Sequence, residues 1–160
     1  MIVMVGVGVV GYGHLGQYLV DNIIKHDDLE LAWVWNRSSL SAKIEDKYIL
    51  EDLNECGRNN PDVIVEVAHP DITRYKLRSQ QLFLHVVIIL FLCRKFGPKF
   101  LSVADFMIGS PTALADRDIE TSLETAADNH GLYIPSGALW GGEDIRKMAD
   151  RGTLKGEIIP

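Results

Sequence analysis

The sequence predicts an α/β fold built on a doubly wound parallel sheet. Three observations carry the prediction: short apolar runs rich in valine recur along the chain, a glycine-rich turn follows the first run, and segments with helical spacing of apolar residues separate several of them. Continuous apolar runs are typical of strands buried on both faces of a parallel sheet. The five runs are Val5–Val10, Leu29–Trp35, Val63–Val67, Val103–Ile108 and Leu132–Ile134.

The turn after the first run has the spacing G-x-G-x-x-G. Residues 5–16 read VGVGVVGYGHLG, so Gly11, Gly13 and Gly16 occupy the three glycine positions. Gly11 allows a tight reversal, Gly13 brings no Cβ against a pyrophosphate, and Gly16 lets the following helix pack close to the strand. The spacing therefore predicts a dinucleotide-binding domain of the Rossmann type.

A helix is expected to begin at this turn. Leu15, Leu19 and Ile23 recur at helical spacing, and the helix is expected to end near Lys25. The amide N–H groups of its first turn, around His14 and Leu15, would point at the phosphates, where the positive end of the helix dipole favours negative charge.

The end of the second run bears on the choice between NAD and NADP. An Asp or Glu about 20 residues beyond the glycines commonly binds the ribose 2′-hydroxyl of NAD, but Leu29–Trp35 is followed by Asn36, Arg37 and Ser38. These side chains donate hydrogen bonds to a 2′-phosphate, Arg37 with full charge assistance. We therefore expect NADP or NAD as cofactor, with NADP accepted; the alternative is that Arg37 is a solvated loop cation.

The third run, Val63–Val67, stops at Ala68 and His69. Ligands of open α/β sheets bind beyond the carboxyl ends of the strands, which predicts that these residues lie near the nicotinamide half of the cofactor. His69 is a candidate general acid or base, or it lines the pocket or caps the next helix. Glu66, inside the apolar strand, either forms a local hydrogen bond or reaches the cofactor. The polar stretch Ser38–Glu55 is expected to hold short helical pieces.

A long segment separates this strand from the next. The 38 residues Asp71–Ile108 replace the single crossover helix and strand expected there, and they contain the apolar stretch Leu82–Cys93 of 12 residues. That stretch is well below the roughly 20 residues needed to cross a bilayer, so no membrane span is expected. Residues 76–98 form an atypical apolar insert with three possible origins: a buried helix or strand, a dimer contact, or a sequence foreign to the fold such as a splice or gene-model insertion, the last being favoured.

The rest of the chain returns to the α/β pattern. Asp116 is expected to cap a helix that ends at Gly131 and buries Ile119, Leu123, Ala126 and Ala127. A further helix is expected from Glu143 to Asp150 and a strand over Leu154–Ile159. The predicted domains are a nucleotide-binding domain over residues 1–140 and, over residues 141–160, the start of an incomplete substrate domain.

Composition narrows the function classes. The net charge of −6 argues against a nucleic-acid surface, which needs clustered Lys and Arg. Cys56 and Cys93 stand far apart without a CxxC or Cys/His cluster, so neither a redox motif nor a metal site is indicated. We expect a reduced, cytoplasmic setting and, since no basic segment or cleavage site precedes the first strand, no secretory signal.

Several segments together resemble the L-aspartate dehydrogenase family. Besides the glycine motif, they are Val34–Arg37 (VWNR), Val65–Pro70 (VEVAHP), Gly109–Leu114 (GSPTAL) and Ser136–Ile145 (SGALWGGEDI). The resemblance covers most of the chain outside residues 76–98. It implies an NAD(P)-dependent oxidoreductase that deaminates L-aspartate to iminoaspartate and oxaloacetate, is a homo-oligomer when full length, and in prokaryotic relatives enters NAD biosynthesis.

The resemblance also implies roles for individual residues. The glycines would bind the pyrophosphate, Asn36 and Arg37 the adenosine ribose, and Ala68, His69, Ala113 and Ala138 the nicotinamide end. The catalytic histidine of the family would lie beyond Pro160, so no catalytic residue is assigned, and the chain is expected to be a truncated form. The alternatives are a catalytically inactive NAD(P)-binding module and a related dehydrogenase acting on another small acid.

Overall fold

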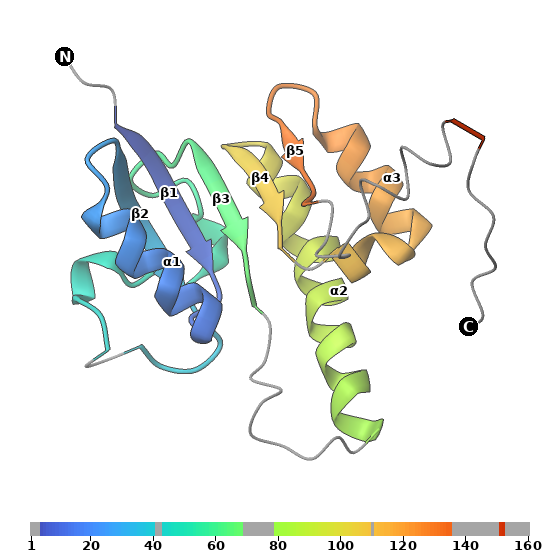
Figure 1. The fold of residues 1–160 in the computed structure, drawn as a ribbon, viewed down its shortest axis with the longest axis horizontal. Helices are drawn as coiled ribbons and strands as arrows, with labels where there is room; N and C mark the ends of the chain where they lie inside the picture. Colours follow the sequence, from blue (N-terminus) through green and yellow to red (C-terminus); the bar gives the residue numbers. More distant parts are fainter. Residues whose placement is uncertain (1–3, 41–42, 69–78, 110, 136–150, 153–160) are drawn as a thin grey trace.

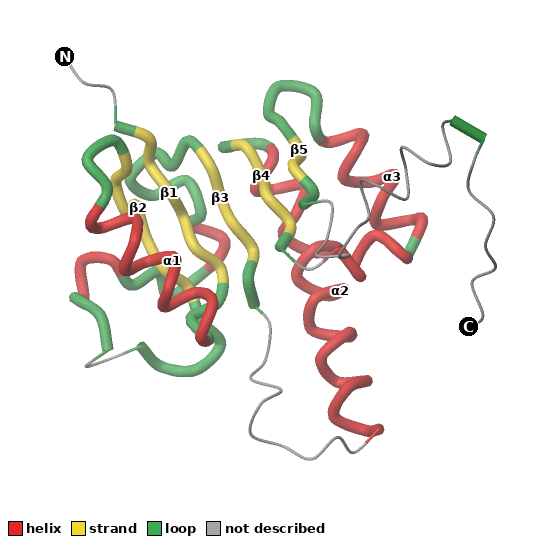
Figure 2. The backbone as a smooth tube through the Cα atoms, viewed as in Figure 1, coloured by secondary structure: helices red, strands yellow, loops and turns green. Residues whose placement is uncertain are grey.

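A computed structural model describes residues 4–40, 43–68, 79–109, 111–135 and 151–152. Helices flank the strands of one sheet (Figure 1, Figure 2). The strands are β1 (Val5–Val10), β2 (Leu29–Trp35), β3 (Val63–Glu66), β4 (Asp105–Ile108) and β5 (Leu132–Tyr133), and the α-helices are α1 (His14–Lys25), α2 (Ser79–Leu101) and α3 (Arg117–Ala126).

The five strands are parallel and lie in the order β2-β1-β3-β4-β5. β1 pairs with β2 on one side and with β3 on the other, so the chain reverses its direction of travel across the sheet between them. Ligands of open α/β sheets bind at such a switch point, beyond the carboxyl ends of the strands. The predicted fold class, a doubly wound parallel sheet, is confirmed.

On the outer side of β2, a single β-bridge marks the position of one more strand. Ile49 forms an isolated parallel bridge with Val34, and the Leu50 amide donates to the Val34 carbonyl at 2.9 Å. The bridge stands on the outer side of β2, where the six-stranded Rossmann sheet has its third strand. Short 3₁₀ turns at Asp46–Tyr48 and Leu53–Glu55 flank it, as expected for this stretch.

Each face of the sheet has its own hydrophobic cluster. On one face Val7 and Val9 of β1 pack with Val20 and Ile23 of α1. On the other, the side chains of α2 and α3 pack against β3 and β4, for example on Ile64. Figure 1 shows the corresponding arrangement, with α1 over β1 and β2 and with α2 and α3 beside β4 and β5.

The helix after the glycine turn forms over the expected residues but with a different buried stripe. Gly16, Val20 and Ile23 are its buried residues, whereas Leu15 is 51% exposed. The sequence pattern placed Leu15 on the apolar face. Because Gly16 is the residue that makes the closest approach to the strand turn, the helix is rotated so that the neighbouring Leu15 points outward.

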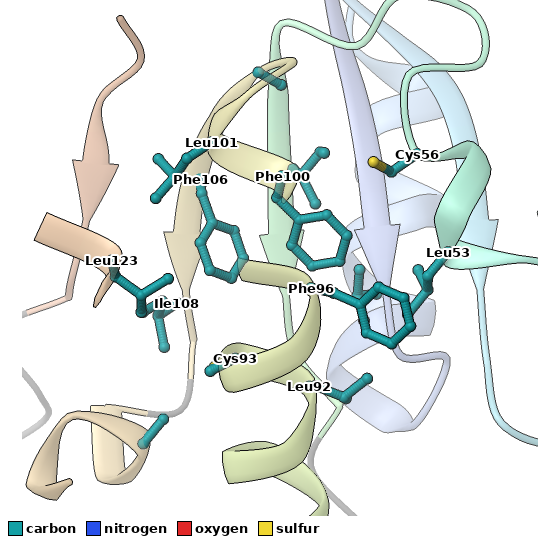
Figure 3. Packing of buried hydrophobic residues seen from close by; sticks show 14 of the residues in the cluster. Leu53, Cys56, Leu92, Cys93, Phe96, Phe100, Leu101, Phe106, Ile108 and Leu123 are labelled. Carbon is teal, nitrogen blue, oxygen red and sulfur yellow. The ribbon is translucent and has the colours of Figure 1, made fainter. Parts of the chain in front are cut away.

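The apolar run within residues 76–98 lies in the long helix α2. Its described part enters the core: Ile89, Leu92, Cys93 and Phe96 are at most 8% exposed. Further along, the Phe100 ring stacks on Phe96 with 6.2 Å between centroids and meets Phe106 of β4 edge-on at 5.2 Å, as Figure 3 shows. Of the readings left open, the buried helix is the one that these contacts support. The origin of the segment and the domain limits stay predictions.

The remaining elements follow the pattern with small shifts. β4 begins at Asp105 rather than Val103, because the Val103 and Ala104 amides still donate to the Phe100 carbonyl at the end of α2. The Asp116 side chain caps α3 by accepting from the amides of residues 118 and 119, as predicted, but the helix ends at Ala126 rather than at Gly131. The helix expected over 143–150 and the strand expected over 154–159 lie outside the described residues.

Candidate functional site

The turn between β1 and α1 is held from both neighbouring strands. On the β2 side, the Gly11 amide donates to the Trp35 carbonyl at 2.8 Å and the Tyr12 amide to Asn36 Oδ1 at 3.1 Å. On the β3 side, the Val67 amide donates to the carbonyl of Val10 at 2.8 Å. The glycine motif therefore lies at the carboxyl edge of the sheet, at the switch point.

Two of the three glycines are dictated by the geometry of this turn. Gly11 has a φ of 108°, and a Cβ on it would lie 2.6 Å from the backbone N and Cα of Ala68. A Cβ on Gly16 would overlap the carbonyl of Gly11. Both positions exclude a side chain, one through left-handed backbone and close approach, the other through close approach alone.

The helix α1 points its amino end at the same edge. Gly13 is its N-cap, with no side-chain cap, and the intrahelical ladder begins with the Gln17 amide donating to the Gly13 carbonyl at 2.9 Å. Amides of a first helical turn have no acceptors within the helix, and here they belong to His14, Leu15 and Gly16. A helix amino terminus favours negative charge through its dipole.

The residues after β2 line an open cavity of about 720 Å³. Its rim includes Asn36 and the exposed Arg37. Ile49, in the segment that bridges to β2, and Arg58 also line it. Asn36 also has a structural task, since its Nδ2 donates to the Ser38 carbonyl at 3.1 Å while its Oδ1 accepts from Tyr12. It thus ties the glycine turn to the loop that carries Arg37.

The charges around this cavity are mixed. Asp46, Glu51 and Glu55 line it together with Arg37 and Arg58. Arg58 was not predicted as a site residue, and its Nη2 donates to the Ile49 carbonyl at 2.6 Å, which secures the segment that bridges β2. Because Arg58 is engaged in this way, the exposed Arg37 is the lining arginine that could pair with a ligand phosphate. Three carboxylates share the cavity with it.

A buried carboxylate lies under the switch point. Glu66 ends β3 with no exposed surface, and its Oε1 accepts a hydrogen bond from the Ala68 amide at 2.7 Å. Burial, and then the charge of Glu66, raise the pKa of the Cys93 thiol to about 12. Of the two readings that the sequence left open for Glu66, this contact supports the local hydrogen bond.

Of the four predicted residues of the nicotinamide end, Ala68 and Ala113 lie within the described part of the chain. Ala68 is half-buried beside Gly11, at the edge of the switch point. Ala113, in the 3₁₀ turn Pro111–Ala115, has no exposed surface and packs in the cluster under α2. His69 and Ala138 lie outside the described residues.

Two further properties bear on the kind of site. Within the described ranges, no three His, Cys, Asp or Glu side chains gather in a way that would hold a metal ion. No described helix combines the length and the apolar character needed to cross a bilayer.

The chain has close curated relatives. It is 49% identical to the aspartate dehydrogenase domain-containing protein of Xenopus tropicalis and 46% identical to that of Danio rerio, each over 93% of the chain. The resemblance read from the sequence is confirmed by these homologues. The chain spans 48% and 49% of their lengths, about half of each. No protein-family model matches it.

Solved dehydrogenase and reductase structures share the fold. An engineered D-amino acid dehydrogenase bound to NADP+ is 17% identical, with a TM-score of 0.60 over 94% of the chain and 42% of the other protein. DAP dehydrogenase of C. glutamicum in complex with DAP is 19% identical, with a TM-score of 0.58 over 96% and 42%. Biliverdin reductase of Synechocystis, in complex with biliverdin and NADP+, is 15% identical, with a TM-score of 0.60 over 96% and 44%.

Proposed function

We propose that this chain, a homologue of the aspartate dehydrogenase domain-containing proteins, is the NAD(P)-binding part of an oxidoreductase. The observation that carries the proposal is the glycine turn at the switch point, where Gly11 and Gly16 have no room for a side chain. Such a turn, followed by a helix amino terminus, suits a pyrophosphate. The solved relatives crystallised with NADP+ support a nicotinamide cofactor.

In this proposal each predicted residue has a part in cofactor binding. The amides of Gly13, His14, Leu15 and Gly16 donate to the pyrophosphate, and Asn36 and Arg37 face the adenosine ribose. Ala68, His69 and Ala138 form the nicotinamide end, and Ala113, which has no exposed surface, supports it from the core. When bound, the cofactor supplies hydride chemistry, and the chain binds and orients it.

Arg37 is the proposed determinant of affinity for NADP. It is exposed at the rim of the cavity beyond β2, and the residue after that strand is Asn36 rather than a carboxylate. A guanidinium pairs with a 2′-phosphate through charge-assisted hydrogen bonds. The lining carboxylates, Glu51 among them, oppose that phosphate, so we propose acceptance of both cofactors.

Titration calorimetry with NAD+ and NADP+ tests this proposal. Wild type is expected to bind both, and Arg37→Ala to lose about tenfold in affinity for NADP+ with little change for NAD+. Arg117→Ala, which removes an exposed arginine from the distant helix α3, is the matched control and is expected to bind like wild type. An unchanged NADP+/NAD+ ratio in Arg37→Ala would remove Arg37 from the site, and a wild type that binds neither cofactor would refute the proposal.

The substrate proposal comes from the homologues. We propose L-aspartate, oxidised by hydride transfer to the nicotinamide, for the full-length homo-oligomeric protein in the cytoplasm. Residues 1–140 would be the nucleotide-binding domain and residues 141–160 the start of the substrate domain. Because the chain spans about half of its relatives, the proposal for the chain itself is cofactor binding without turnover. Formation of reduced cofactor from L-aspartate by the 160-residue chain would contradict this.

A further inference from the structure

Among the described residues, Glu66 is the charged residue that is buried. It lies at the end of β3, next to the glycine turn of the proposed site. Placing a carboxylate in an apolar interior is unfavourable unless hydrogen bonds compensate it. It shares the α2-facing side of β3 with Ile64, two residues earlier, which packs in the core cluster there. An apolar residue at position 66 would therefore suit the core better than a carboxylate does.

The contacts of this carboxylate lead to the phosphate-binding turn in two steps. Glu66 Oε1 accepts from the Ala68 amide at 2.7 Å. The backbone of Ala68 lies against Gly11 so closely that a Cβ on Gly11 would be 2.6 Å from it. The carbonyl of Gly11 in turn occupies the space that a Cβ on Gly16 would need. A shift of Ala68 would thus be passed to two glycines of the motif.

The hydrogen bond acts where the β-ladder has ended. The Val67 amide donates to the Val10 carbonyl at 2.8 Å, and the Gly109 amide to the Glu66 carbonyl at 2.7 Å. These bonds tie the end of β3 to β1 and β4. The next amide, that of Ala68, is held by the side chain of Glu66, so this carboxylate extends the fixed backbone by one residue, to the one that contacts Gly11.

We infer that Glu66 is a positioning residue for the phosphate-binding turn, acting through Ala68 on Gly11. The inference rests on the proposed function, since it assigns the turn to a dinucleotide. It names a side chain on a different strand from the glycine motif, with no direct contact to the ligand required.

Two substitutions separate positioning from charge. Glu66→Gln keeps a side-chain carbonyl that can accept from the Ala68 amide, whereas Glu66→Leu removes the acceptor at similar size. Affinities for NADP+ and for ADP-ribose, which has the pyrophosphate but no nicotinamide, are measured by calorimetry under conditions where every variant is folded. We expect Glu66→Leu to weaken both ligands about tenfold or more, and Glu66→Gln to weaken them less than about threefold.

Ile64→Ala is the matched control for general damage to this strand. It removes a fully buried side chain from the same face of β3, two residues from Glu66, so it is expected to lower stability and leave both affinities within about twofold of wild type. Hydrogen exchange at the Ala68 amide is the second readout, and it is expected to accelerate in Glu66→Leu and not in Ile64→Ala.

The outcomes distinguish this inference from the proposed function. It is overturned if Glu66→Leu binds like wild type, if Ile64→Ala loses as much affinity, if Glu66→Gln is as weak as the Leu variant, or if only NADP+ and not ADP-ribose is affected. A wild type that binds neither ligand refutes the proposed function and this inference together.

Discussion

The helices α1 and α2 cover opposite faces of the same sheet, and they were predictable to very different degrees. α1 has 12 residues and a buried stripe at helical spacing. α2 has 23 residues, and its apolar run gives no such stripe because nearly every position is apolar. Periodicity identifies the buried face of a helix only when the opposite face is polar.

The sequence of α2 indicates its buried face only after the apolar run has ended. Lys95 and Lys99 are exposed there, while Phe96 and Phe100 are buried one turn apart. Phe91, earlier in the helix, is 54% exposed despite its apolar character. The contrast teaches that the pattern of α1 predicts the extent of the helix and a buried stripe, which the close approach of Gly16 shifts by one residue. The orientation of α2 instead comes from the ring packing against β4 (Figure 3).

The largest expected effect tests that packing in α2. Phe100 is fully buried and contacts the rings of Phe96 and Phe106, so Phe100→Ala should lower the free energy of unfolding by about 3–5 kcal/mol. Phe91→Ala on the same helix is the matched control and should change it by less than about 1 kcal/mol. Urea denaturation measures both, and similar losses in the two variants would mean that α2 is not oriented as described.

The corresponding test in α1 concerns its closest approach to the strand turn. A Cβ at residue 16 overlaps the Gly11 carbonyl, so Gly16→Ala should cost about 1–3 kcal/mol although alanine is the better helix former. It should also weaken NADP+ binding. Tyr18→Ala, at an exposed position of the same helix, is the control in both assays, and a Gly16→Ala variant more stable than wild type would contradict the account of this contact.

A pH titration probes the core between β3 and α2. Burial and the charge of Glu66 raise the pKa of Cys93 from its ordinary 9.0 to about 12. The thiol therefore stays protonated in the folded chain while it ionises in the unfolded one. The stability it contributes is complete below pH 9 and is lost as the pH rises towards 12.

The free energy of unfolding of wild type, relative to Cys93→Ala, should accordingly fall by about 1.3 kcal/mol between pH 8 and pH 10. Denaturation curves for both chains at the two pH values give this difference, and the alanine variant corrects for the other groups that titrate. A difference that does not change with pH would place Cys93 in water rather than in the core.

The smallest expected effect concerns the cap of α3. Asp116 Oδ1 accepts from the amides of Asp118 and Ile119 at 3.0 and 3.3 Å, so Asp116→Ala should cost about 1 kcal/mol. Its pair with Arg94, which is 62% exposed, adds little. Asp116→Asn keeps the cap and should restore most of the loss. Equal losses in the Ala and Asn variants would assign the effect to the ion pair instead.

The residues of the candidate site also differ in how far the sequence alone could predict them. The valine run, the glycine spacing and Asn36 with Arg37 are local in sequence, and the structure brings them to one edge. Glu66 was visible only as a carboxylate in an apolar strand, and its contact with the Ala68 amide depends on how the chain ends β3. Arg58 could not be predicted from the sequence. Its partner is the Ile49 carbonyl, and the position of Ile49 depends on a β-bridge to Val34 that no local sequence pattern indicates.

The central claim, that a dinucleotide binds at the carboxyl edge between β1 and β3, is tested most directly by NMR. Adding NADP+ to the ¹⁵N-labelled chain should shift the amide signals of residues 11–16 and 36–38 most strongly. The amides of Asp62 and His130, which line a cavity of about 630 Å³ away from the glycine turn, should stay unchanged. Shifts confined to that second cavity, or none at saturating NADP+ and NAD+, would contradict the claim.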